Sequence, residues 1–183
     1  MQAQRVALCR HTSDDLAYFL EWYADRELAR LTRHDQTPLS RSQIVTYFQT
    51  IIMPSSARGH CFGIQATDST PPRLIGTCSL TDLAHETGTL RILIGPHECW
   101  GKGYGTEAVR LLVAYGFEHL KLREIVLGVF DFNERAIRSY ERVGFRHAST
   151  IRLNMPLGLP PAQEYLMTIT PTSFQHPKNE RSN

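Results

Sequence analysis

Trp100-Gly101-Lys102-Gly103-Tyr104-Gly105 is the stretch from which the rest of the sequence is best interpreted. It lies between an apolar stretch that favours a strand, residues 89–94, and apolar residues at helical spacing that continue to Leu120. Alternating glycines at such a turn remove Cβ atoms, so an anion can reach backbone N–H groups at the positive end of the helix dipole. The segment predicts a phosphate-binding turn, to which Lys102 adds charge and Thr106 a hydroxyl. The alternative is a turn that needs glycine for steric reasons only.

Two other nucleotide-binding motifs do not fit this segment. A Walker loop needs GxxxxGK followed by Ser or Thr, which is absent. A dinucleotide fingerprint needs GxGxxG after the first strand of a parallel βαβ unit, whereas the spacing here is GxGxG. Both motifs are therefore excluded.

Hydrophobic periodicity on both sides of the glycine-rich segment predicts a mixed α/β protein. Short apolar runs predict strands at residues 5–10, 60–67, 74–81, 89–94, 124–132, 145–153 and 164–170. Apolar residues at helical spacing predict helices at residues 16–28, 44–52, 108–120 and 134–142. The three strands between residues 60 and 94 are joined by short connections, which is typical of an antiparallel meander.

Capping signals mark the starts of the first two predicted helices. Thr12 with Asp15, and Ser40 with Gln43, have the spacing of a capping box. The second helix is expected to stop at Pro54. The chain is expected to form one domain over residues 1–170, followed by a disordered tail over residues 171–183, because the tail is polar and without periodicity.

The composition excludes several classes of protein. The chain has 20 basic and 18 acidic residues, a net charge of +2, so no broad field for nucleic acid or a membrane is expected. Its four cysteines and eight histidines show no CxxC or HExxH spacing, so no metal is expected. The absence of a signal peptide or membrane span, together with scattered cysteines, predicts a cytoplasmic protein.

A second segment follows about thirty residues later, where a predicted strand ends and a short helix begins. Asn133 is placed to cap this helix. Ala136 and Tyr140 are four residues apart and so share a helix face. The small Ala136 would let a ligand lie against the helix beside the Tyr140 hydroxyl; the alternative is that Tyr140 is an ordinary core aromatic.

The two segments together resemble a known family. Residues 100–108 resemble the acetyl-CoA motif of the GNAT superfamily of N-acetyltransferases, and Asn133-xx-Ala136-xxx-Tyr140-xxx-Gly144-Phe145 resembles its second motif. The first motif is most similar to the branch that contains RimJ/RimL-type ribosomal-protein acetyltransferases and spermidine acetyltransferases. The resemblance covers roughly residues 5 to 170. It implies the GNAT fold: a mixed, mostly antiparallel sheet of about seven strands, splayed at its centre, with about four helices.

The resemblance also implies how acetyl-CoA is held. Pantetheine is expected between the strands 89–94 and 124–132, where its amides pair with an exposed strand edge. The pyrophosphate is expected on the glycine-rich turn, and the second motif is expected to contact the pantetheine arm. The implied cofactor-binding residues are Ile92, Leu93, Ile94, Trp100, Gly101, Lys102, Gly103, Tyr104, Gly105, Thr106, Asn133, Ala136 and Tyr140.

The family chemistry is direct attack of an amine on the thioester carbonyl. An alkyl amine with a pKa near ~10 must first lose a proton. Backbone N–H groups of residues 89–94 are the expected donors to the oxyanion. The leaving thiolate, with an ordinary thiol pKa of about 8.5, benefits from a nearby acid. Tyr140 is the expected catalytic acid.

The general base stays open at this point. Many relatives carry a glutamate early in the strand before the glycine-rich turn, and the aligned position here is Thr89. Nearby alternatives are Asp82, His85, Glu86, Asp25 and Glu27, each of which is also consistent with a solvated surface residue.

The resemblance predicts an N-acetyltransferase whose acceptor is a small amine, an amino sugar or antibiotic, or a protein N-terminus. The alternative is an acyl-CoA-binding module without turnover, as the departure at Thr89 suggests. The monomer or homodimer is the expected assembly. The residues of the predicted acceptor pocket are basic and aromatic. They favour an anionic acceptor, or they are ordinary helix surface on which arginine stems cover apolar area. It draws on Trp22, Tyr23, Arg26, Arg30, Arg33, His34 and residues 156–161.

Overall fold

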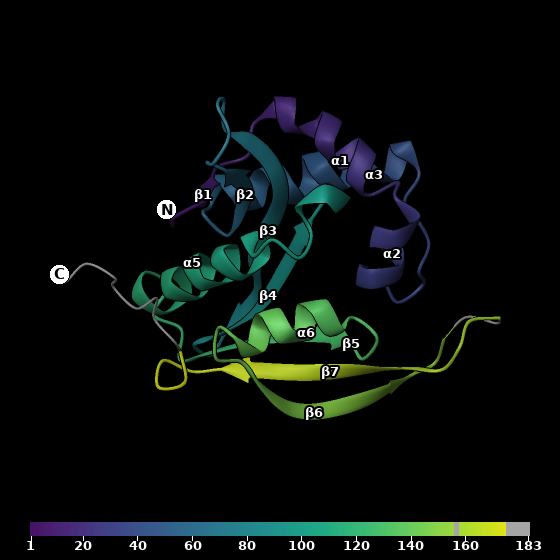
Figure 1. Ribbon diagram of the computed structural model, residues 1–183, viewed down its shortest axis with the longest axis vertical. Helices are drawn as coiled ribbons and strands as arrows, with labels where there is room; N and C mark the ends of the chain where they lie inside the picture. The colour runs from purple at the N-terminus through teal and green to yellow at the C-terminus, as the bar shows by residue number, and fades with distance from the viewer. Residues whose placement is uncertain (156–157, 175–183) are drawn as a thin grey trace.

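The computed structural model describes residues 1–155 and 158–174 (Figure 1). The strands are β1 (Val6–Cys9), β2 (Cys61–Ala66), β3 (Arg73–Ala84), β4 (Thr87–Ile94), β5 (Glu124–Phe130), β6 (Arg146–Leu153) and β7 (Ala162–Ile169). The helices are α1 (Leu16–Trp22), α2 (Arg26–Thr32), α3 (Arg41–Tyr47), α4 (Met53–Ala57), α5 (Tyr104–Glu118) and α6 (Glu134–Glu141). Every predicted strand is present, and their ends differ by a few residues.

All seven strands form one mixed sheet in the order β1-β2-β3-β4-β5-β7-β6. Each neighbouring pair is antiparallel except β4 and β5, which run parallel. This confirms the predicted α/β fold with a mostly antiparallel sheet. The parallel pair follows from the chain connection, because α5 carries the chain from the end of β4 back to the start of β5.

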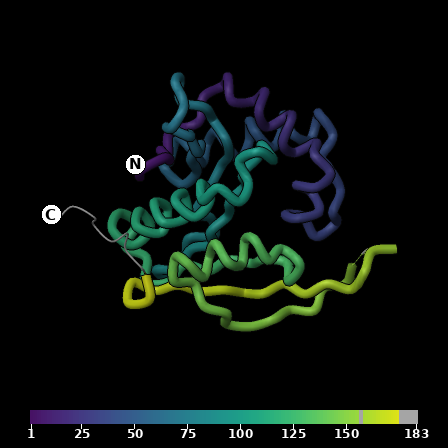
Figure 2. The backbone as a smooth tube through the Cα atoms, viewed as in Figure 1, coloured from purple at the N-terminus to yellow at the C-terminus, as the bar shows by residue number. Residues whose placement is uncertain are grey.

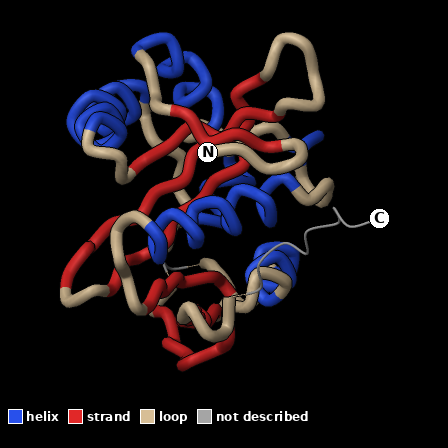
Figure 3. Tube along the Cα trace, turned by 90° about the vertical axis from the view of Figure 1, so that its left-hand side faces the viewer, coloured by secondary structure: helices blue, strands red, loops and turns tan. Residues whose placement is uncertain are grey.

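Two apolar clusters sandwich the sheet. One packs α5 and α6 against one face through residues such as Leu112, Ile125 and Tyr140. The other packs α1 to α3 against the opposite face of β2 to β4, around Trp22 and Leu93. Figure 2 shows the chain from β5 onward lying apart from this N-terminal half, and Figure 3 shows α5 running along the sheet from a perpendicular direction.

The prediction of one helix over residues 16–28 is wrong, because two helices occupy that stretch. The first helix ends at Trp22, and Asp25 then accepts a hydrogen bond from the Leu28 N–H at 2.7 Å. A carboxylate in this position caps a new helix and competes with continuation of the old one.

The prediction that the second helix stops at Pro54 is also wrong. The chain stays helical to Ala57 through a π-helical segment, Phe48–Ile52, after which Pro54 lies in the first turn of α4. Proline is accommodated there because the π-helical turn just before it, in which the Met53 N–H bonds to the Phe48 carbonyl, widens the helix where an uninterrupted α-helix would clash with the proline ring.

The described chain continues beyond the predicted domain end. Phe174 is 8 % exposed and packs edge-on against Phe117 of α5, with ring centroids 5.9 Å apart. The prediction of disorder from Pro171 is therefore wrong for residues 171–174, where an apolar side chain docks on the core. Residues 175–183 lie outside the described residues.

The described residues show three further features that bear on function. No helix within them is long and apolar enough to cross a membrane. They contain no group of three or more His, Cys, Asp or Glu side chains arranged to hold a metal ion. All four cysteines are unpaired, and three of them are buried.

Candidate functional site

The site begins where β4 and β5 separate. The two strands pair only at Thr87–Glu124, Gly88–Ile125 and Thr89–Val126. Beyond Thr89, residues 90–94 have no partner on the β5 side, although they stay paired with β3. The predicted splay is therefore confirmed, and Figure 1 shows β4 and β5 running apart.

Only alternate residues of β4 present their peptide groups to this gap. The Gly95 N–H donates to the Ile75 carbonyl of β3 at 2.9 Å, so by the alternation of an antiparallel ladder Leu93 also faces β3. The peptide groups of Ile92 and Ile94 face the gap instead. The prediction that Leu93 is a main-chain contact for a ligand is wrong, because the peptide groups of successive strand residues point alternately to the two sides of the strand, and those of Leu93 point to β3.

The glycine-rich turn has the backbone shape that its sequence predicts. Gly101 and Gly103 have φ values of +73° and +90°, and Gly103 is the N-cap of α5. These are left-handed backbone conformations, which residues with a Cβ atom rarely adopt. A Cβ added to Gly101 would meet no other atom within 4 Å, and a Cβ added to Gly105 would lie 3.7 Å from its nearest neighbour. The glycines therefore leave a bare backbone surface.

The amides of this turn find no acceptor in the part of the chain that the structure describes. The first backbone hydrogen bond of α5 runs from the Glu107 N–H to the Gly103 carbonyl at 3.1 Å. Within residues 1–155 and 158–174, no backbone carbonyl accepts from the amides of residues 101–106. Six successive donors at the positive end of a 15-residue helix suit a diphosphate. The turn therefore fits the pyrophosphate of CoA.

Side chains around the turn hold it in place. Arg5 pairs with Glu107 at 2.7 Å, and its guanidinium lies 5.3 Å from the centre of the Tyr104 ring. Hydrogen bonding to Glu107 raises the pKa of Arg5. The Tyr104 hydroxyl donates to Asp68 at 2.6 Å, so its side chain points toward the β2–β3 loop. Sequence inspection missed Arg5 because its partner lies 102 residues away.

Trp100 connects the turn to both sides of the gap. Its indole N–H donates to the Ile94 carbonyl at 2.8 Å, which leaves the Ile94 N–H as that residue's free group toward the gap. His97 stacks on one side of the indole with centroids 4.0 Å apart, and the Arg135 guanidinium of α6 lies 4.0 Å from the ring centre. The second motif therefore contacts the first through Arg135, which sequence inspection had not selected.

A hydroxyl pair also joins the two motifs. Thr106 and Ser139 oxygens lie 2.7 Å apart, so the Thr106 hydroxyl is already bonded to α6. Lys102 is exposed and forms no ion pair with another described residue. Of the two polar side chains predicted for the phosphate, Lys102 is the freer one.

The second motif has the local structure that its sequence predicts. The Asn133 side chain caps α6 by accepting from the Ala136 N–H at 3.3 Å, which uses its oxygen and leaves its NH₂ group for another partner. Ala136 is partly exposed, whereas Tyr140 is 9 % exposed. Tyr140 packs in the core, and its hydroxyl donates to no described residue, so a contact with a ligand stays a prediction.

Burial controls the protonation of Tyr140. It raises the pKa of the phenol to about 12. At neutral pH the hydroxyl is therefore protonated and available as a donor. Because an ordinary thiol has a pKa of about 8.5, such a phenol stabilises a thiolate more readily by a hydrogen bond than by full proton transfer.

The structure places the open base alternatives at different points. His85 and Glu86 form the β3–β4 hairpin turn with positive φ, and Glu86 pairs with Arg123 at 2.8 Å. Asp82 lies 3.7 Å from Arg91. These contacts hold Asp82 and Glu86 in surface ion pairs. Asp25 caps α2, 3.3 Å from His97, and Glu27 pairs with Arg30 at 2.7 Å.

The predicted acceptor residues divide between core and surface. Trp22 is buried beneath Gly95, and Tyr23 stacks on Phe19 with centroids 5.5 Å apart. Arg30 lies 5.1 Å from the centre of the Phe132 ring, and His34 makes an edge contact with Phe130. The predicted linker contribution at residues 156–157 lies outside the described residues.

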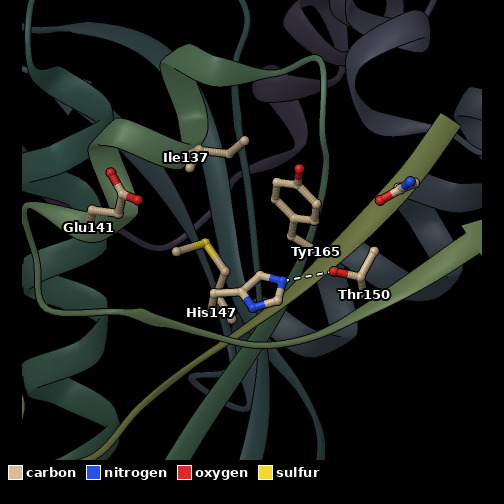
Figure 4. Close-up of a pocket in the computed structure, with 7 residues that line it drawn as sticks. Ile137, Glu141, His147, Thr150 and Tyr165 are labelled. Carbon is tan, nitrogen blue, oxygen red and sulfur yellow. Dashed lines mark hydrogen bonds between the residues drawn. The ribbon is translucent and has the colours of Figure 1, made fainter.

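A separate cavity lies between α6 and the strands β6 and β7 (Figure 4). His147 and Thr150 are hydrogen-bonded across its floor at 2.9 Å, and Tyr165 and Glu141 line its sides. Tyr165 and Met167 project to the same sheet face as α6, because alternate residues of a strand share a face. The cavity is therefore distinct from the β4–β5 gap.

Comparisons with known proteins agree with this geometry. The family model described as "Acetyltransferase (GNAT) domain" matches residues 5–146. The chain is similar to the human alpha/beta-tubulin-N-acetyltransferase 9, at 28% identity over 80% of this chain and 75% of that protein. It is also similar to the uncharacterized N-acetyltransferase YoaA of Bacillus subtilis, at 28% identity over 85% and 87% of the two chains.

The fold is similar to that of a solved structure with ligands. Spermidine N-acetyltransferase from Vibrio cholerae, in complex with CoA and spermine, superposes with a TM-score of 0.76 at 18% identity, over 92% of this chain and 97% of that chain. GNAT acetyltransferases use acetyl-CoA, which is consistent with the turn and gap described above. The two motifs, the splayed sheet and the match over residues 5–146 establish that this chain is an acyltransferase enzyme and belongs to the GNAT family of acetyltransferases.

Proposed function

We propose that this enzyme transfers an acetyl group from acetyl-CoA to a primary amine, by direct attack of the amine within a ternary complex. The observation that carries the proposal is the run of amides at residues 101–106, which have no acceptor in the described protein and lie beside the splay of β4 and β5. Anion binding at a helix N-terminus explains why such donors are left free.

The gap assigns a role to each neighbouring group. The Ile92 carbonyl and the Ile94 N–H pair with the pantetheine amides, which leaves the Ile92 N–H for the reacting carbonyl, and the Asn133 NH₂ group donates to the pantetheine arm. Ala136 leaves room for that arm beside α6, and Lys102 screens the phosphate charge. The turn from Trp100 to Thr106 holds the pyrophosphate through its backbone.

The chemical step follows from the same arrangement. The neutral amine attacks the thioester carbonyl carbon, a C–N bond forms, and the C–S bond breaks to release the thiolate of CoA; the surplus proton on the nitrogen passes to solvent or to that thiolate. Gap-facing N–H groups of β4 stabilise the oxyanion, which for one good donor is worth on the order of 3–4 kcal/mol. The protonated Tyr140 hydroxyl donates to the departing sulfur, and its burial keeps it in the donor form.

The acceptor is a primary amine that enters from the α1–α3 face of the sheet, opposite α5. One relative is named for tubulin and one structural neighbour for spermidine, so the acceptor screen needs both peptide N-termini and polyamines. The spermidine neighbour supports that part of the predicted branch, and the ribosomal-protein part stays a prediction. Unpaired cysteines suit a cytoplasmic enzyme, which works as a monomer or homodimer.

Titration of the protein with CoA, followed by calorimetry, tests the first half of the proposal. Saturable binding is expected, and its absence would remove the basis for acyl transfer. Release of free thiol from acetyl-CoA in the presence of an amine panel tests the second half. Saturable CoA binding without amine-dependent thiol release from any member would contradict the proposed transfer.

A further inference from the structure

A carboxylate lies on the acceptor side of the gap and has no lysine or arginine partner among residues 1–155 and 158–174. Glu164 of β7 is directly opposite Phe130 of β5 in the sheet register. Its side chain is 19 % exposed, and among the described residues its one ion-pair contact is His34, at 3.4 Å and itself 64 % exposed. Burying a carboxylate costs free energy unless a cation forms an ion pair with it, and an exposed histidine offers only a weak partner.

Gly128 makes room for this carboxylate and sets its direction. A Cβ built on Gly128 would collide with the Glu164 carboxylate at Oε1. To reach Gly128 the Glu164 side chain must cross from β7 onto β5, which is the direction of β4 and the gap. Gly128 itself is exposed, so this surface of β5 is open to solvent.

The position is close to the point where β4 and β5 part. Val126 is the last β5 residue paired with β4, and Gly128 is the next residue on the same face of the strand. This face is opposite the one that packs on α5, since Ile125 and Leu127 belong to the α5 cluster. A group bound to Glu164 therefore approaches the gap from the side opposite α5.

The cations nearby are already paired. Arg30 of α2 makes two hydrogen bonds to Glu27 at 2.7 and 2.9 Å, and Arg33 makes two to Asp35 at 2.8 and 3.0 Å. The Glu164 carboxylate, in contrast, accepts no hydrogen bond from the described residues, and its contact with His34 is longer, at 3.4 Å. Its Oε2 faces His34, and its Oε1 lies over Gly128.

We propose that Glu164 binds the acceptor amine in its protonated form, before it loses the proton that attack on the thioester requires, and that Gly128 gives the Glu164 carboxylate access to the gap. The acceptor is accordingly a cationic amine. The inference rests on the proposed function, because it assumes that an amine enters this gap. Glu164 binds and orients the acceptor, so its loss raises KM far more than it lowers kcat.

The test measures equilibrium binding of amines to the CoA-bound enzyme, with a panel of a polyamine, an amino sugar and a short peptide with a free N-terminus. Wild type is expected to bind at least one member, and Glu164→Gln to weaken that binding about 30-fold, in line with loss of one charge-assisted contact. Glu141→Gln, which removes the same charge on the α6 side, is the matched control and should leave binding unchanged. CoA binding without binding of any amine, or amine binding that survives Glu164→Gln, overturns this inference. Loss of CoA binding by wild type overturns the proposed function instead.

A double-mutant cycle separates a binding role from a structural one. Gly128→Ala should raise KM for the amine in the wild-type background, because its Cβ displaces the carboxylate. In the Glu164→Ala background the same change should have no further effect, since nothing remains to be displaced. Glu164→Asp should restore part of the affinity. Additive effects of Gly128→Ala and Glu164→Ala, or no rescue by aspartate, would show that Glu164 does not hold the amine.

Discussion

The two sides of the β4–β5 gap are built in different ways. On the α5 side, donors come from the backbone of one short segment, residues 101–106, and a contiguous motif specifies their shape. On the α2 side, the candidate groups come from three distant segments: the side chains of His34 and Glu164, and Gly128, whose missing side chain leaves room for the Glu164 carboxylate. A ligand common to a family can be recognised by backbone, whereas a variable ligand needs side chains that can change without altering the fold.

The largest effect is expected on the backbone side. Gly103→Val should weaken CoA binding about 1,000-fold, since it combines a strained φ of +90° with the loss of charge-assisted hydrogen bonds. The new side chain would also meet the Arg5 guanidinium, 2.9 Å from the Cβ position. Calorimetric titration with CoA measures the change. Gly158→Ala, at φ +91° with open space around it, is the control for backbone strain alone and should bind CoA normally.

The next effect concerns chemistry between the two sides. Tyr140→Phe should lower kcat about 100-fold and leave CoA affinity within about twofold, because the hydroxyl acts on the departing sulfur. Steady-state kinetics with acetyl-CoA and the best acceptor of the panel measure both values. Tyr165→Phe, in the separate cavity of Figure 4, is the matched control. A wild-type kcat in Tyr140→Phe would rule out its role as donor.

The free energy of unfolding should also depend on pH, through a pair of side chains, His11 and Asp15, on the acceptor side of the sheet. The His11 side chain is fully buried and lies 2.7 Å from Asp15. Burial opposes its charge, but the contacts with Asp15 and Cys61 prevail and raise the pKa of His11 to about 9. Because this folded-state pKa exceeds the ordinary 6.5, the stabilisation is complete below about pH 6.5 and is lost as the pH rises through about 9.

Thermal melts should therefore show a Tm that falls by about 5 °C between pH 6.5 and pH 9.5. Asp15→Asn should lower the Tm at pH 6.5 and remove most of this fall, since the charged partner is gone. An unchanged pH profile in Asp15→Asn would show that the pair does not control stability. CoA affinity should vary little over the same range, if the backbone side is independent of this pair.

The smallest effect is expected where the two motifs touch. Arg135→Ala removes a guanidinium 4.0 Å from the Trp100 ring centre, a contact worth about 0.5–1 kcal/mol at a partly exposed site. CoA affinity should fall by about threefold. Arg138→Ala, which removes an exposed arginine paired with Glu134 on the same helix, is the control. A loss of tenfold or more in Arg135→Ala would show that this side chain contacts the ligand directly.

Local sequence patterns determined much of this protein. Strand and helix types follow from hydrophobic periodicity, and the shape of the glycine-rich turn follows from glycines at 101 and 103, because only glycine adopts these φ values readily. The cap at Asn133 was likewise predictable from its place before a short helix. Such features depend on neighbours within a few residues, which the sequence displays directly.

Tertiary structure decided the rest, because it depends on residues far apart in the chain. The break at Asp25 and the helical turn after Pro54 are exceptions, because a cap and a π-helical segment set them locally in a way that the apolar pattern did not display. The alternation of β4, which turns Leu93 to β3, needed the strand register. The approach of Glu164 to Gly128 and His34 needed the whole sheet, since no local pattern brings residues 34, 128 and 164 together. The sequence alone thus determined the backbone that suits CoA, and only the folded chain decided which side chains face the acceptor.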